Sequence, residues 1–367
     1  MDITLTAKLL LNTSEEQYRL LEDLSEAYRK GCNFVSEIAF HTGEYNRVNL
    51  QKESYGYLRN TIGLKSQMAI SVTRTVAAKY TKEKRAKISK PVFFSLPQCD
   101  QVLGRDWSIS IEKGIVSLNT LEGRIRVPFS ARGYEKYMTG DARFGGAKIV
   151  LRKKKAFLYA SVKLDCPDTV MDEKKVVGAD LGIRHSAVTY DGKSTKFYKG
   201  TKLKETRAKY KEVRQSLQKR GTPSSRRRLK AIGKRESRYV SNENHILAKT
   251  LVSDNGPGTT FVLEDLSGVR DATAKVRRKD RYVMVSWPYH DLQQKLEYKA
   301  AMNGSSVVYV DPRYTSQRCP HCGNVDKEAR DRSRHEYRCR ECGYRGNDDR
   351  TGAMNIRQRG LEKIKQG

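Results

Sequence analysis

The sequence predicts a multidomain α+β protein, with a β-rich N-terminal half that helices interrupt and a C-terminal half in which strands and helices alternate. Three observations favour this class. The chain has 367 residues, which is enough for two or three domains with cores of their own. Its 37% hydrophobic and 31% charged residues are typical of a globular protein. The apolar pattern also changes along the chain, from alternation to helical spacing and back.

In the N-terminal half, a single strand precedes a helical insert. Residues 2–10 alternate in part between apolar and polar side chains and predict a strand. From Ser14 to about Lys84 the spacing becomes helical, in two long segments. Beyond Pro91, short apolar runs separated by glycines predict further strands, up to about Asp168. We therefore expect a small β-barrel or sandwich that the helical insert interrupts.

The C-terminal half has a different order of elements. It is expected to contain, in turn, strands over 175–181 and 186–190, a third strand after an Asp-Gly turn, a basic segment, an amphipathic helix, the strand TTFVLEDL, a helix over 289–302, the strand SSVVYV, a cysteine module and a last helix from about Thr351. This order is typical of an RNase H-like domain, a mixed sheet covered by helices.

The net charge indicates the kind of partner. Seventy-two Lys and Arg against 42 Asp and Glu leave a formal charge of +30. A compact protein carries such a charge at some cost in stability, so a polyanionic partner is the natural explanation, although a merely soluble basic protein is the alternative. The sequence has no apolar run of about 18 residues and no signal-peptide pattern, so we expect a cytoplasmic protein with no membrane contact.

Four of the seven cysteines form the pattern C-x2-C-x16-C-x2-C. They are Cys319, Cys322, Cys339 and Cys342. Each C-x2-C turn directs two thiolates at one ion, and two such turns complete the tetrahedron that zinc prefers. Because four protein ligands leave no open position, we expect one structural Zn²⁺ ion. The other cysteines, Cys32, Cys99 and Cys166, are expected to be ordinary small apolar residues.

Three acidic residues stand where a nuclease could use them. Asp180 and Glu264 each end a predicted strand, and Asp349, or its neighbour Asp348, opens the last helix. Singly, each could be a turn former, a strand-end charge or a helix cap. Together, such residues converge at one edge of an RNase H-like sheet and can hold two Mg²⁺ ions for phosphodiester cleavage. His185 is given no catalytic role.

The basic segment Lys204–Arg238 carries 14 Lys or Arg. Charge runs are often solvated faces, but the overall charge favours a nucleic-acid track here, with Arg226, Arg227 and Arg228 as candidate contacts. The pattern does not distinguish RNA from DNA.

Several motifs resemble those of the TnpB family of transposon-encoded, RNA-guided nucleases, from which type V CRISPR effectors are thought to derive. VVGADLGIRHSAV, FVLEDLSGV and NDDRTGAMNI resemble the three RuvC motifs of that family. WPYHDLQQKLEYKAAMNG, YTSQRCPHCG and CRECGYRGNDD resemble its C-terminal signature. These matches span about half of the chain, whereas the N-terminal half holds no diagnostic motif.

The resemblance implies a domain layout. A wedge β-barrel would occupy 1–12 and 91–170, interrupted by a helical recognition lobe at 13–90. A RuvC-like nuclease domain would occupy 171–314 and 345–367, with a zinc ribbon inserted at 315–344.

The resemblance also implies an activity: RNA-guided, Mg²⁺-dependent cleavage of double-stranded DNA next to a short transposon-associated motif. One chain would act with one guide RNA from the transposon end, and Asp180, Glu264 and Asp349 would be the catalytic metal ligands. The motif-reading residues are expected, from the layout, on the second helix of the insert and at a barrel turn. They are Ser66, Gln67, Ser71, Thr75, Asn119 and Thr120.

Two alternatives remain open. The chain could be a nucleic-acid-binding transposition regulator whose cleavage is dispensable, although such a protein needs no complete acidic trio. It could also be a compact type V CRISPR effector, which shares the chemistry but takes its guide from another source.

Overall fold

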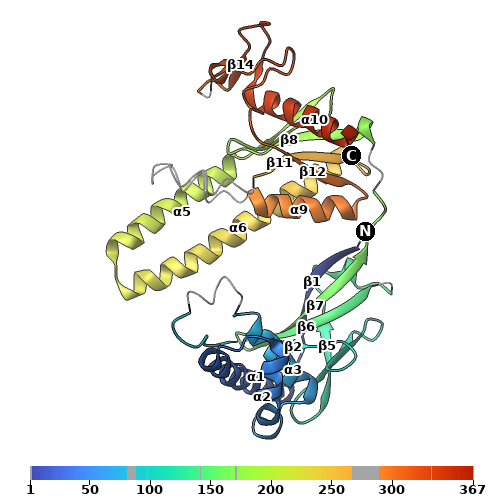
Figure 1. Cartoon of the computed structure of the whole chain (residues 1–367), viewed down its shortest axis with the longest axis vertical. Coiled ribbons are helices and arrows are strands. Elements are labelled where there is room, and N and C mark those ends of the chain that lie inside the picture. Colours follow the sequence, from blue (N-terminus) through green and yellow to red (C-terminus); the bar gives the residue numbers. More distant parts are fainter. Residues whose placement is uncertain are drawn as a thin grey trace. The chain divides into compact units, whose positions relative to one another are not determined.

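The computed structural model describes residues 2–80, 88–96, 98–140, 142–169, 172–266, 289–331 and 333–366 (Figure 1). The chain divides into two compact units, Asp2–Leu164 and Asp165–Gly367. Each unit has a hydrophobic core of its own. Within the described ranges, no helix is both long enough and apolar enough to cross a membrane.

The N-terminal unit is built on a seven-stranded sheet with the order β2-β6-β7-β1-β5-β4-β3. Its strands are β1 (Asp2–Leu11), β2 (Cys99–Gln101), β3 (Trp107–Ser110), β4 (Ile115–Asn119), β5 (Arg124–Ser130), β6 (Arg143–Arg152) and β7 (Lys155–Asp165). Trp107 on one edge strand is fully buried, and its indole N–H donates to Gly145 O on β6, near the other edge, at 3.2 Å. The sheet therefore nearly closes, and the β-barrel expected from the sequence is confirmed.

Three helices follow β1: α1 (Glu15–Thr42), α2 (Arg47–Asn60) and α3 (Ser66–Ala77). Ser14 and Gln17 form a capping box at the start of α1, and Gly43 ends it with a positive φ of 70°. The prediction of two long helical segments is wrong here, because a turn at Gly43 divides the first of them into α1 and α2. Ser66 therefore begins the third helix rather than the second. The expected end of the helical insert, near Lys84, lies outside the described residues.

The C-terminal unit contains a five-stranded sheet with the order β10-β9-β8-β11-β12. Its strands are β8 (Val176–Asp180), β9 (His185–Tyr190), β10 (Thr195–Lys199), β11 (Thr260–Glu264) and β12 (Ser306–Val310). The first three form an antiparallel meander, and β11 runs parallel to both β8 and β12. This is the mixed RNase H-like sheet that the element order predicts.

Helices cover both faces of this sheet. Alternating residues of β8 and β11 point to opposite sides, as the two-residue period of a strand requires. Val177 and Phe261 join the core with α6 (Pro223–Asn255) and α9 (Tyr289–Met302). Val176 and Val262 instead pack with Ile356 of α10 (Asp348–Gln366).

The basic segment expected as a polar stretch is a helical hairpin. It comprises α5 (Thr201–Arg220) and the first half of α6, joined by a turn at Gly221 with φ of 65° (Figure 1). The buried carboxylate of Glu236 on α6 pairs with Arg207 and Arg214 of α5. The second half of the basic segment and the amphipathic helix thus belong to one continuous helix, α6.

A small three-stranded sheet precedes α10. Its strands are β13 (Arg330–Asp331), β14 (Glu336–Arg338) and β15 (Arg345–Asn347). The ribbon sheet therefore runs to Asn347, three residues beyond the expected boundary, and the next residue already belongs to α10.

Candidate active site

Asp180 and Glu264 end adjacent parallel strands. The register of β8 and β11 pairs Val176 with Thr260 and Gly178 with Val262. Carried two residues further, the same register puts Asp180 beside Glu264, on the face that α10 covers. The strand period alone therefore brings both carboxylates to one edge and one face of the sheet.

Glycines bring α10 close to that face. A Cβ at Gly178 of β8 would lie 2.2 Å from the carbonyl oxygen of Ala353, so only glycine permits this approach. On α10 itself, a Cβ at Gly352 would lie 2.7 Å from Asp180 Oδ2. The first turn of α10, which carries Asp348 and Asp349, is thus held against the end of β8.

The acidic residues line one cavity of about 780 Å³. Asp180, Glu264 and Asp349 contribute to its wall, together with Asp348 and Arg330. The structure therefore brings together the three residues that the sequence singled out, from two strands and a helix.

The electrostatics of the cavity suit a cation. Burial raises the pKa of Asp180 well above its usual range, and the carboxylates of Glu264 and Asp349 raise it further. Burial also raises the pKa of Glu264. A divalent cation would offset both effects, and Mg²⁺ prefers hard oxygen ligands of this kind. The residues present therefore fit Mg²⁺.

The two neighbouring aspartates have different surroundings. The Asp348 side chain is 1% exposed, and Arg330 Nε donates to its Oδ2 at 2.9 Å. His335 Nδ1 lies 3.4 Å from its other oxygen. Since Arg330 and His335 both belong to the ribbon, Asp348 ties the ribbon to α10. Asp349 is 15% exposed, with Oδ1 at 3.6 Å from Arg330 Nη2.

His185 also belongs to this site, although no catalytic role was expected for it from the sequence. Its Nδ1 lies 2.8 Å from Asp349 Oδ2. The pair is separated by 164 positions in the chain, and only the packing of α10 against β9 brings it together. The position of His185 at the start of β9, five residues after Asp180, was the one available signal.

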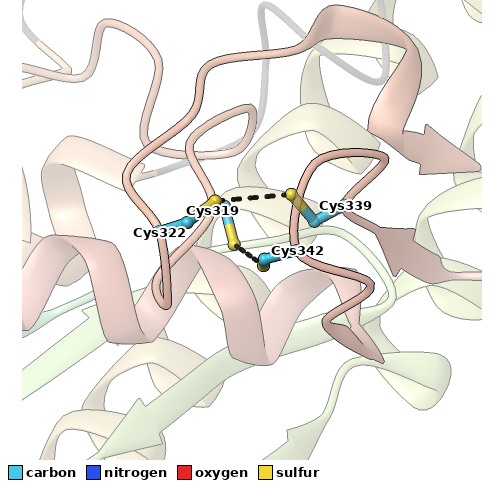
Figure 2. Close-up of side chains that lie close together, drawn as sticks. All are labelled: Cys319, Cys322, Cys339 and Cys342. Carbon is cyan, nitrogen blue, oxygen red and sulfur yellow. Dashed lines mark hydrogen bonds between the residues drawn. The ribbon is translucent and has the colours of Figure 1, made fainter.

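The four cysteines of the ribbon converge on one point (Figure 2). Their sulfur atoms all lie within 4.8 Å of one another, and the pairs Cys319–Cys342 and Cys322–Cys339 are each 3.6 Å apart. A disulfide would need about 2.05 Å. Zinc–sulfur bonds of about 2.3 Å give a tetrahedral edge of about 3.8 Å. The cluster therefore fits one zinc ion and no disulfide.

Known proteins resemble the chain in sequence and in fold. A family model described as Cas12f1-like, TNB domain, matches residues 289–356. The chain is 29% identical over 248 residues to the CRISPR-associated endodeoxyribonuclease Cas12f1 of Sulfoacidibacillus thermotolerans, a match that covers 63% of this chain and 57% of the relative. It is 28% identical over 199 residues to TnpB-like protein MJ0751 of Methanocaldococcus jannaschii, covering 52% of this chain and 71% of the relative.

The fold comparison agrees. A structure titled "Cryo-EM structure of the Cas12f1-sgRNA-target DNA complex" covers 94% of this chain and 83% of its own, with a TM-score of 0.66 at 15% identity. The chain is similar to proteins of the TnpB/Cas12f-like family in sequence. It spans 57% and 39% of the lengths of two Cas12f1 relatives that it matches.

Among the expected motif-reading residues, two are corrected. The side chains of Ser71 and Thr120 are fully buried, so neither can reach a duplex. Ser71 lies on the face of α3 that also carries the core residues Met68 and Val72. Thr120 donates to Gly123 O at 2.9 Å and thereby closes a turn.

The other four behave differently. Arg105 Nη1 donates to Gln67 Oε1 at 2.8 Å, and Asn119 Nδ2 donates to Arg105 O at 3.0 Å. Arg105 therefore links Gln67 of α3 to Asn119 of β4. Ser66 is exposed, while Thr75 bonds to Tyr28 and Asp100. Whether these four read DNA stays a prediction.

The candidate phosphate contacts lie on the hairpin. Arg226, Arg227 and Arg228 are exposed near the start of α6. Their guanidinium groups are available to a backbone phosphate, and this role also stays a prediction.

Proposed function

We propose that the chain is an RNA-guided, Mg²⁺-dependent DNA endonuclease that cleaves double-stranded DNA next to a short transposon-associated motif. The observation that carries the proposal is the convergence of Asp180, Glu264 and Asp349 on one cavity. The relative named Cas12f1 is an endodeoxyribonuclease by name, and the similar structure is titled as a complex with sgRNA and target DNA. A guide RNA and target DNA are the corresponding partners here.

The chain's own residues have separate tasks in this proposal. Asp180, Glu264 and Asp349 would hold two Mg²⁺ ions, and bound Mg²⁺ would supply water activation and stabilisation of the leaving 3′ oxygen. Arg330 lines the same cavity and offers positive charge to the scissile phosphate. His185 fixes one oxygen of Asp349.

The remaining surfaces bind nucleic acid mostly through its backbone and read little of its sequence. The exposed arginines Arg226, Arg227 and Arg228 contact the sugar-phosphate backbone, and base pairing with the guide reads most of the target. Protein side chains read only the short motif, with Ser66, Gln67, Thr75 and Asn119 as the accessible candidates.

The test uses protein co-expressed with RNA from its own flanking DNA. The purified complex is incubated in Mg²⁺ with plasmids that carry a guide-matched target behind randomised neighbours. We expect guide-dependent double-strand cuts beside one enriched motif. Asp180→Ala should abolish them, while Asp191→Asn, in the exposed β9–β10 turn, should cut like wild type.

Each rival gives its own result. A regulator without cleavage would bind RNA and target DNA but leave the plasmid intact in Mg²⁺. A CRISPR effector would cut only with RNA from a repeat array. Undiminished cutting by Asp180→Ala would contradict the proposed site.

A further inference from the structure

The end of β11 is held from two sides. The backbone carbonyl of Glu264 accepts a hydrogen bond from Gln293 Nε2 of α9 at 2.8 Å. Its side chain is contacted by Thr315, whose hydroxyl donates to Glu264 Oε1. The backbone of this residue is therefore fixed by the sheet and α9, while its carboxylate is oriented by a different segment, the loop after β12.

We propose that Thr315 is a positioning residue for Glu264. Its hydroxyl holds one carboxylate oxygen, Oε1, and so presents the other, Oε2, to the cavity for a divalent cation. The inference rests on the proposed function, because it assigns a task to a residue that supports the same metal site.

The hydroxyl has one proton and two acceptors within reach. Pro312 O lies 2.9 Å from Thr315 Oγ1, and Glu264 Oε1 is the other acceptor. A hydrogen bond to an ionised carboxylate is about twice as strong as one to a neutral carbonyl. The proton therefore goes to Glu264 whenever that carboxylate is ionised, which is the form that binds a cation.

Thr315 itself is fixed by α10. Its side chain is buried, with 3% of the residue exposed. Asn355 of α10 donates from Nδ2 to Thr315 O at 2.8 Å and to Arg318 O at 2.7 Å. α10 also carries Asp349. The Glu264 carboxylate is therefore connected, through Thr315 and Asn355, to the same helix that positions Asp349.

A direct metal-binding measurement tests the role. Mn²⁺ serves as the probe, because carboxylate sites that suit Mg²⁺ also accept it. Titration calorimetry or electron paramagnetic resonance of the full-length, zinc-loaded protein gives its Kd. Supporting hydrogen bonds to metal ligands are worth about 10- to 100-fold in affinity. We expect Thr315→Val to weaken Mn²⁺ binding at least about tenfold, and Thr315→Ser to stay near wild type.

Three further variants complete the experiment. Glu264→Gln removes the ligand itself and should abolish binding at this site. Thr250→Val removes a similar threonine hydroxyl, which donates to Ile246 O at 3.0 Å on α6, and should bind Mn²⁺ normally. Thr315→Ala repeats the loss of the hydroxyl with a smaller side chain, in case valine prevents folding.

The outcomes separate the two ideas. If Glu264→Gln leaves Mn²⁺ binding intact, the cavity is not the metal site and the proposed function fails. If Glu264→Gln abolishes binding but both Thr315→Val and Thr315→Ala stay within about twofold of wild type, the positioning role is wrong and the metal site stands. Equal losses in Thr315→Val and Thr315→Ser would also overturn it, because serine keeps the hydroxyl.

Discussion

The adjacent aspartates at the start of α10 lead to opposite predictions. Asp348 is 1% exposed and forms a 2.9 Å hydrogen bond with Arg330 of the ribbon, whereas Asp349 is 15% exposed and lines the cavity with Asp180 and Glu264. We therefore expect Asp348→Asn to lower stability while Asp349→Asn abolishes cleavage.

The magnitude follows from the contacts. A hydrogen bond between charged partners contributes about 1.5–3 kcal/mol, and Arg330, at 22% exposed, is only weakly screened. Asp348→Asn should thus cost about 2 kcal/mol, which lowers Tm by about 4–8 °C for a unit of this size. Asp349→Asn weakens the contact with His185 but also removes one negative charge from a group of carboxylates, so these effects oppose each other and the free energy of unfolding should fall less than in Asp348→Asn.

Scanning calorimetry of the full chain measures the stability, with zinc present and Mg²⁺ absent. Cleavage is measured well below Tm, where we expect about a thousandfold loss for Asp349→Asn and a small loss for Asp348→Asn. Glu336→Gln, at an exposed acid of the same ribbon, is the control and should leave both properties unchanged. Unchanged Tm in Asp348→Asn together with abolished cleavage would refute the reasoning, because it would exchange the roles of the two residues.

Three other changes have expected outcomes. Since folding raises the pKa of Asp180, its contribution to stability is present below the unfolded value of about 3.9 and is lost as the pH rises through the folded value. Asp180→Asn should therefore raise the Tm of Mg²⁺-free protein at pH 7, and this gain in Tm should vanish near pH 4. Thermal melts at several pH values measure it. An equal gain in Tm at pH 7 and pH 4 would contradict the prediction. Gly178→Ala would put a Cβ 2.2 Å from the Ala353 carbonyl oxygen and should lower the free energy of unfolding, measured by chemical denaturation, by about 1–3 kcal/mol. Unchanged stability would mean that α10 can move away from β8 without a loss of free energy. Cys342→Ser should lower the zinc content below about one ion per chain, which metal analysis measures. It should also lower the cleavage rate in saturating Mg²⁺. Full cleavage without zinc would show that the ribbon does not support the acidic site.

Much of this site follows from local pattern. Asp180 and Glu264 were predicted because a short apolar strand ends at each, and neighbouring strands of an RNase H-like sheet bring such ends to one edge. The four cysteines were predicted because their spacing determines the geometry of the cluster. In both cases the decisive information lies within a few residues of the site.

The contacts that orient the acids could not be predicted in this way. His185 meets Asp349 across 164 positions, and Thr315 meets Glu264 across 51. Such pairs depend on how α10 packs on the sheet, which in turn depends on close glycine contacts that the sequence does not reveal. The error at Ser71 has a different origin, since its three-residue spacing from Met68 already indicated the buried face of α3.

The adjacency of Asp348 and Asp349 has a geometric reason. Successive residues of an α-helix point about 100° apart, so two neighbours at a helix start necessarily face different surroundings. The Asp348 carboxylate contacts Arg330 and His335 of the ribbon, whereas the Asp349 carboxylate contacts His185 of the five-stranded sheet and acts on Asp180, with Arg330 farther away at 3.6 Å. Because both belong to the same turn, a displacement of the ribbon that moves Asp348 must also move Asp349. The four-cysteine cluster is therefore coupled to the acidic cavity through a single helical turn. A residue inserted between Cys342 and these aspartates should disturb cleavage more than one inserted between Cys322 and Cys339.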